Sequence, residues 1–152
     1  VVVENKNSSD TWSSFRVGKR ARTKVLKSDK ISSCINIKSQ HDGYRNVINS
    51  RTHTREWIFK ENVLMINDKI GGKSRVKANS ILILHPDINI ISSNNDTYTL
   101  EDKNKKKIFI NILKGIPKTN KTFFSLQFGR REKTKCISID LISNESKISI
   151  SW

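Results

Sequence analysis

Several features that mark common protein classes are scarce in this 152-residue sequence. There are two cysteines, two prolines and six glycines, and no apolar run approaches the roughly 20 residues of a membrane-spanning helix. Nowhere do apolar residues recur at helical spacing over ten or more positions, so we predict no helix. These absences disfavour a cysteine-rich scaffold, a membrane-spanning chain and a helical bundle.

Motifs for several kinds of catalysis are also missing. No serine lies in a Gly-x-Ser-x-Gly turn, no glycine-rich phosphate loop occurs, and neither cysteine has a histidine nearby in the sequence. The 14 acidic residues stand mostly beside lysine or arginine in expected turns, whereas a glycosidase needs two carboxylates in different environments. The sequence therefore disfavours a serine or cysteine hydrolase, a nucleotide-binding enzyme and a glycosidase.

Cys34 and Cys136 lie about 100 residues apart in two expected strands, without metal-site spacing. We expect two buried free thiols. A single disulfide that closes a long loop is the alternative, and it would require an oxidising compartment.

What the sequence does contain is apolar residues that alternate with polar ones. Hydrophobic residues make up 35% of the chain, and an alternation with a period of two is typical of half-buried antiparallel strands. The pattern predicts one all-β domain over residues 1–152, a two-layered antiparallel sandwich of about 11 or 12 strands. The expected strands are 1–4, 12–25, 34–41, 53–59, 63–66, 75–85, 88–92, 97–100, 106–113, 122–128, 135–142 and 147–152. Residues 115–121 are expected to form a loop.

The central feature is a predicted hairpin that begins at His53 and ends at Ile66, followed by the Gly71-Gly72 break. His41 ends the preceding strand at the rim of an apolar face. On these adjacent strands His41, His53 and Asp68 are the one trio that could converge on a metal ion. Their spacing matches no known metal motif, so we favour hydrogen-bonded core or rim residues over a zinc site.

The formal net charge of +15 predicts attraction to polyanions such as acidic polysaccharide, nucleic acid or an anionic membrane. The commonest residues are Lys, Asn, Ile and Ser, whose codons an AT-rich genome favours. The alternative is therefore that part of the positive charge reflects composition and not function. The expected strand 12–25 places Arg16, Arg20, Arg22 and Lys24 on one face without aromatic neighbours. Such a surface suits phosphate, sulfate or carboxylate equally, and it lacks the stacking platform of a nucleic-acid binder. The run Lys103–Lys107 is most simply a solvated loop, with anion contact as the alternative.

Cleavage of a uronate by β-elimination needs a base and neutral or cationic groups that stabilise the developing charge. His41, Tyr44, Arg55 and Arg16 have this chemistry, although the sequence does not show that they meet.

The order and spacing of several short motifs resemble those of the C-terminal β-sheet domain of heparinase II/III-like polysaccharide lyases. The motifs are Trp12–Ala21 (WSSFRVGKRA), His41–Tyr44 (HDGY), His53–Arg55 (HTR), Ile66–Gly72 (INDKIGG), Leu84–Pro86 (LHP) and the late Phe128-Gly129. Together they span nearly the whole chain.

The resemblance implies a β-sandwich that follows an N-terminal helical toroid in an enzyme that cleaves acidic, uronate-containing polysaccharide by β-elimination. It implies that the family's catalytic residues and structural metal ligands precede Val1. This piece would then carry no complete active site, no metal and no cofactor. A divalent metal would belong to the full-length protein. A periplasmic or secreted location is the expectation that goes with the family.

On this interpretation the partners are an acidic polysaccharide and the toroid of the same protein, with no membrane span and with nucleic acid disfavoured. We expect His41, Tyr44, His53 and Arg55 to be mainly structural, with contact to the polyanion at the rim as a further role. Arg16 and Arg20 have the same two roles open to them. The alternative function is a non-catalytic module that binds an acidic glycan or nucleic acid by charge alone.

Overall fold

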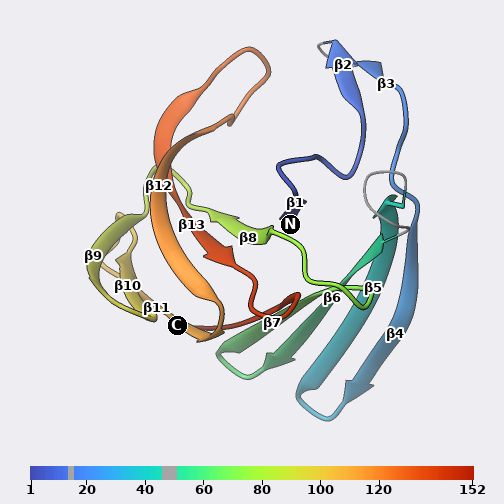
Figure 1. Cartoon of the computed structure of the whole chain (residues 1–152). Helices are drawn as coiled ribbons and strands as arrows, with labels where there is room; N and C mark the ends of the chain where they lie inside the picture. The colour runs from blue at the N-terminus through green and yellow to red at the C-terminus, as the bar shows by residue number, and fades with distance from the viewer. Residues whose placement is uncertain (14–15, 46–50) are drawn as a thin grey trace.

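The computed structural model describes residues 1–13, 16–45 and 51–152, and it is built from antiparallel strands in two layers (Figure 1). Within the described part of the chain there is no helix, and therefore no helix that could cross a membrane. The predicted all-β antiparallel sandwich is confirmed.

The described strands number fourteen, more than the 11 or 12 expected. They are β1 (Val2–Val3), β2 (Thr11–Ser13), β3 (Arg16–Val17), β4 (Thr23–Ile31), β5 (Cys34–Tyr44), β6 (Arg51–Lys60), β7 (Val63–Ile70), β8 (Ala78–Ile83), β9 (Asn89–Asn94), β10 (Thr97–Glu101), β11 (Lys107–Lys114), β12 (Ile116–Phe124), β13 (Glu132–Asp140) and β14 (Glu145–Ser151).

The strands form a large and a small sheet. The large sheet has eight strands in the order β4-β5-β6-β7-β14-β11-β10-β9, and the small sheet has four in the order β1-β8-β13-β12. Strands β2 and β3 pair only with each other. The central hairpin is present as β6 and β7, which pair from His53 opposite Ile70 to Lys60 opposite Val63.

The space between the sheets holds two apolar clusters. The larger one combines the inward side chains of β7, β10, β11 and β14 with those of β13 and the end of β8, and its buried members are Ile66, Leu84, Tyr98, Leu100, Ile110, Ile112, Ile137, Ile139 and Ile148. The smaller one comprises Val3, Tyr44, Ile70 and Ala78. Alternation places these side chains on the inner faces, because successive residues of a strand point to opposite sides.

Several expected strand boundaries are wrong, among them that of 122–128, which ends at Phe124 in β12. Residues 12–25 do not form one strand, because the described part of this stretch divides into β2, β3 and the start of β4, with 18–22 outside any strand. Arg16, Arg20, Arg22 and Lys24 therefore do not line one strand face. The expected strand 75–85 is shorter, since only Ala78–Ile83 pairs in β8.

The expected loop 115–121 is instead most of β12, which pairs with β13 from Ile116 opposite Asp140 to Phe124 opposite Glu132. The proline at position 117 is tolerated because β12 is the edge strand of the small sheet, where a missing N–H costs no ladder bond. Gly115 makes the turn into this strand with φ +132°, and a Cβ there would lie 2.3 Å from Ile139 Cγ2.

Cys34 lies in β5 of the large sheet and Cys136 in β13 of the small sheet, and both thiols are free. The prediction of two buried free thiols is confirmed for Cys136, whereas Cys34 is free but only partly buried.

The packing between the sheets predicts a sharp difference between two isoleucines of the small sheet. Ile139 is fully buried, whereas Ile83 is 52% exposed. We expect Ile139→Ala to lower the free energy of unfolding by about 2–5 kcal/mol, because it leaves a cavity. The matched Ile83→Ala should cost less than about 1 kcal/mol. Urea unfolding of both variants measures the difference, and equal losses would contradict the assigned inner face.

Candidate functional site

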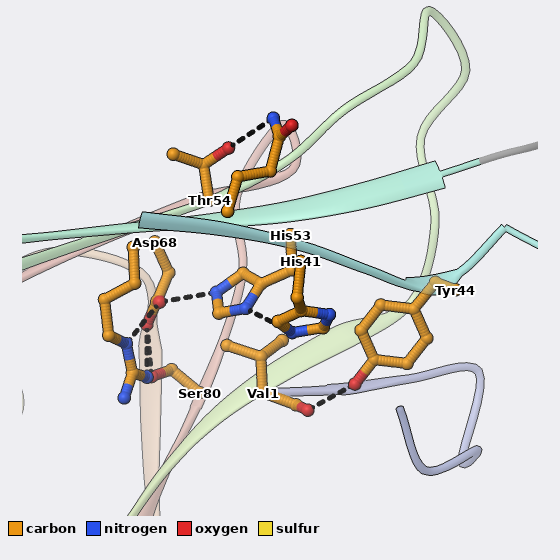
Figure 2. A network of polar contacts seen from close by, with 9 residues as sticks. Val1, His41, Tyr44, His53, Thr54, Asp68 and Ser80 are labelled. Atoms are coloured by element: carbon orange, nitrogen blue, oxygen red, sulfur yellow. Dashed lines mark hydrogen bonds and ion pairs between the residues drawn. The ribbon is translucent and has the colours of Figure 1, made fainter. Parts of the chain in front are cut away.

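The predicted trio of His41, His53 and Asp68 does converge, and it forms a chain of hydrogen bonds between the two apolar clusters (Figure 2). His41 Nε2 lies 3.0 Å from His53 Nδ1, and His53 Nε2 lies 2.7 Å from Asp68 Oδ1. Strand pairing causes this arrangement, because His41 is directly opposite His53 between β5 and β6.

The backbone assigns the tautomers of this chain. Gly43 N–H donates to His41 Nδ1 at 3.2 Å, so the proton of a neutral His41 sits on Nε2 and is donated to His53 Nδ1. His53 then carries its proton on Nε2 and donates to the Asp68 carboxylate. Every bond in the chain is made with both imidazoles neutral.

Asp68 is the end point of this chain and joins the two sheets. Its side chain is fully buried. Arg55 binds it with two parallel bonds, Nε to Oδ1 at 2.7 Å and Nη2 to Oδ2 at 2.9 Å. Ser80, on β8 of the small sheet, donates its hydroxyl to Asp68 Oδ2 at 2.6 Å. The carboxylate therefore accepts hydrogen bonds from β6 of its own sheet and from the opposite layer.

The environment of Asp68 stabilises its ionised form. Burial by itself raises the pKa of Asp68, but the hydrogen bonds from His53, Arg55 and Ser80, together with the positive charge of Arg55, outweigh it and lower the pKa far below its usual range. A permanently ionised carboxylate that is saturated with donors cannot act as a proton acceptor at neutral pH.

Burial, together with the positive charges of the amino terminus and Arg55, lowers the pKa of His41 to about 4, against an opposing contribution from Asp42. Burial also raises the pKa of Tyr44, and the Tyr44 hydroxyl donates to the Val1 carbonyl (Figure 2). His41 is therefore neutral with both nitrogens bonded, and Tyr44 is a protonated donor. Neither offers a free basic atom in this arrangement.

The same bonds occupy the lone pairs that a metal ion at this trio would use. A metal would need lone pairs directed at one point, but His41 Nδ1 and His53 Nδ1 each accept a hydrogen bond, and Asp68 is occupied by Arg55 and Ser80. Across the described ranges, no group of three His, Cys, Asp or Glu side chains is arranged to hold a metal.

Arg16 and Arg20 lie apart from this chain, on the segment that runs through β2 and β3. Arg16 places its guanidinium 5.8 Å from the ring centre of Trp12, and Trp12 is 67% exposed. The basic surface thus has an aromatic neighbour, which corrects the prediction that it lacks one. Trp12 and Arg16 lie on two short paired strands, β2 and β3, and not on one long strand.

Arg20 lines a pocket of about 540 Å³ between the segment 8–22 and the end of β5. The lining residues are Ser8, Asp10, Gly18, Lys19, Arg20, Arg22, Asp42, Gly43 and Arg45. Four are cationic and two are acidic, and Asp42 is engaged by the Arg22 backbone N–H at 2.8 Å and by Arg45 at 3.9 Å. We call this the basic pocket.

The basic pocket adjoins the histidine chain through Gly43, which lines the pocket and donates its N–H to His41. Sequence reasoning missed Lys19 and Arg45 as members of the pocket. The signal for Arg45 was its position one residue after Tyr44, at the end of the strand that carries His41.

Comparison with known proteins now bears on this geometry. The family described as "Heparinase II/III-like, C-terminal" matches residues 1–152, the whole chain. The chain belongs to this family. No curated protein sequence matches it.

Among solved structures, the heparinase II/III-like chain is similar to the "Heparinase III-BT4657 gene product", with a TM-score of 0.68 and 13% sequence identity over 84% of this chain and 20% of that chain. A second structure of the same product with methylated lysines gives the same values. At this identity the likeness concerns the fold, and our chain spans about a fifth of the length of these neighbours.

The first prediction from this site concerns the buried carboxylate. Asp68→Asn should lower the free energy of unfolding by about 3–5 kcal/mol, because it leaves the Arg55 charge in the interior without its partner. Asp29→Asn is the matched control. Asp29 pairs with Lys27 at 3.0 Å on the surface, with side chains 42% and 48% exposed, so its loss should cost less than about 1 kcal/mol. Chemical denaturation compares the two, and a mild effect of Asp68→Asn would contradict the central role of this carboxylate.

The second prediction concerns pH. The pKa of His41 is lower in the folded state, about 4, than the ordinary histidine value of 6.5, so the unfolded chain binds more protons between these values. Stability contributed by neutral His41 is complete above about pH 6.5 and is lost as the pH falls toward 4. His41→Gln should flatten the fall in unfolding free energy over this window, measured by denaturant titrations at several pH values. His85→Gln, which changes a histidine outside the chain, should keep the slope; an unchanged slope in His41→Gln would contradict the assignment.

Proposed function

We propose that this domain is the β-sandwich of a polysaccharide lyase that cleaves acidic, uronate-containing polysaccharide by β-elimination, and that it contacts the glycan without carrying a complete active site. The observation that carries the proposal is membership of the heparinase II/III-like C-terminal family over the whole chain. The basic pocket supplies a surface of matching charge.

The chemistry of the histidine chain supports a positioning role for it. Elimination requires a base that can take the proton next to the uronate carboxyl group. His41 and Tyr44 do not present a free basic atom, and Asp68 is saturated with donors. We infer that His41 and Gly43 hold the wall of the basic pocket in place, and that the base belongs to another part of the full-length protein.

The basic pocket can bind carboxylate or sulfate groups directly. Lys19, Arg20 and Arg22 come from one segment and Arg45 from the end of β5, so the cations approach the space from two sides. Arginine binds carboxylate and sulfate with two parallel hydrogen bonds, which fixes the orientation of the anion as well as its position. We propose that Arg16 with exposed Trp12 extends this surface, because an aromatic face can pack against a sugar ring.

The test of this function uses the full-length gene product with heparin, heparan sulfate, alginate and hyaluronan as separate substrates. Elimination creates an unsaturated uronate whose ultraviolet absorbance can be followed. We expect absorbance to rise with at least one substrate, and silence with all of them would overturn the lyase proposal. Retention of the protein on heparin without any elimination would favour the alternative of a non-catalytic polyanion-binding module.

Glycan contact at the basic pocket has its own prediction. Arg20→Ser combined with Arg45→Ser should raise the KM of the full-length lyase by about three- to tenfold with a smaller change in kcat, because the cations hold substrate away from the reacting atoms. The control is Lys106→Ser combined with Lys107→Ser, which removes the same net charge from the β10–β11 turn and the start of β11. Equal effects of the two double variants would show that net charge, rather than the pocket, matters.

A further inference from the structure

The β12–β13 hairpin carries an arrangement of charges that the sandwich itself does not need. Strands β12 and β13 lie at one side of the small sheet, and their connecting end projects away from the packed layers toward the top of Figure 1. The inner face of β13 holds Ile137 and Ile139, both fully buried in the larger cluster. Farther toward the hairpin end, the same face becomes cationic and exposed.

The register places two lysines directly opposite each other. Lys121 on β12 is paired with Lys135 on β13, and the next pair on the same face is Phe123 with Lys133. All four residues are exposed. Like charges that face each other across an antiparallel pair destabilise the sheet. This arrangement therefore lowers the stability of the hairpin when no anion is bound to it.

No acidic side chain of the described residues neutralises these lysines. Lys121, Lys133 and Lys135 take part in none of the ion pairs of the described ranges. The two acidic residues of the hairpin, Glu132 and Asp140, are opposite Phe124 and Ile116 and therefore belong to the other face. Glu132 lies 4.0 Å from Arg130, and Asp140 pairs with Lys118 at 2.7 Å.

An aromatic ring completes the cationic surface. Phe123 is 47% exposed, and Arg131 holds its guanidinium 4.2 Å from the centre of the ring. A hollow of about 570 Å³ follows this part of the hairpin and is lined by Lys121, Thr122, Phe123, Lys133, Thr134 and Lys135. Three lysines and one aromatic ring are thus gathered at one concave surface, whereas Thr134 donates its hydroxyl to the Leu84 carbonyl.

We propose that this hollow is a second binding site for an acidic sugar unit, separate from the basic pocket. A carboxylate or sulfate between Lys121 and Lys135 removes their repulsion, and the apolar face of the sugar ring packs on Phe123 and on the lysine stems. The proposal rests on the proposed function for the kind of polymer, but it concerns binding alone.

The same charges could attract nucleic acid. The number of aromatic rings decides between nucleic acid and an acidic sugar unit. Single-stranded nucleic acid is held by several aromatic rings on which successive bases stack. The hollow offers one ring, and Arg131 already lies over it. One partly covered ring with three lysines suits a sugar unit with one or two anionic groups better than a row of bases.

The test compares two double variants of this protein that lose the same charge. Lys121→Thr with Lys135→Thr should weaken binding to heparin oligosaccharides by about three- to tenfold in calorimetry. Lys106→Thr with Lys107→Thr, near the β10–β11 turn, should change it less than about twofold. Thermal unfolding is the fold control. The hairpin variant should be as stable as the parent protein or more so, because the facing lysines repel each other.

Phe123→Leu tests the aromatic contact and should weaken heparin binding, whereas Phe109→Leu, on the large sheet with a 44% exposed ring, should not. Equal losses of heparin affinity in the two lysine variants, or no loss in either, would overturn the proposal. A hairpin variant that binds DNA more weakly but keeps its heparin affinity would also overturn it. Failure of the lyase assay with hairpin binding intact would remove only the proposed function.

Discussion

The structure depends on one buried carboxylate that holds the two sheets in a fixed relation. Asp68 accepts bonds from Arg55 and His53 on β6 and from Ser80 on β8, so one side chain ties the central hairpin of the large sheet to the small sheet. A buried ion pair contributes little net stability compared with apolar packing, but losing one partner is costly. Its main effect is therefore on which arrangement the chain adopts.

That effect can be read from the strand register. Arg55 stands directly opposite Asp68 between β6 and β7. A slip of one residue would turn His53 and Arg55 to the outer face and leave the carboxylate among apolar side chains without donors, since side chains alternate with a period of two. The isoleucines of the larger cluster tolerate small rearrangements more readily than this fully bonded group does. The polar chain thus fixes the register that places His41 and Gly43 beside the basic pocket.

The sequence predicted the parts of the fold that local alternation controls. The period of two predicts the sandwich, the β6–β7 hairpin and the meeting of His41, His53 and Asp68, because these features follow from side-chain direction on neighbouring strands. It failed at residues 115–121, where glycine and proline favour a loop in isolation but an edge strand tolerates proline. Whether a segment lies at the edge of a sheet depends on its pairing with a strand far away in the sequence. The alternation of apolar and polar residues does not show that pairing.

The same limit applies to the aromatic residues. Trp12 and Phe123 lie in expected strands, yet both side chains are substantially exposed. The binding surfaces of both proposals use such residues. Sequence alternation identified the side chains that could pack, and the three-dimensional arrangement decided which of them remained available to a partner.

The balance of cations and acids differs from one part of the surface to another. On the outer face of the large sheet, Glu145 is bound by Lys69 at 2.9 Å and Lys114 at 2.6 Å, and these bonds lower its pKa to about 2. Two cations are thus matched there by one carboxylate. In the basic pocket and on the β12–β13 hairpin, cations outnumber acids. The β2–β3 segment and the end of this hairpin both project toward the top of Figure 1. Contact with one acidic polymer would neutralise the cations of both projections at once.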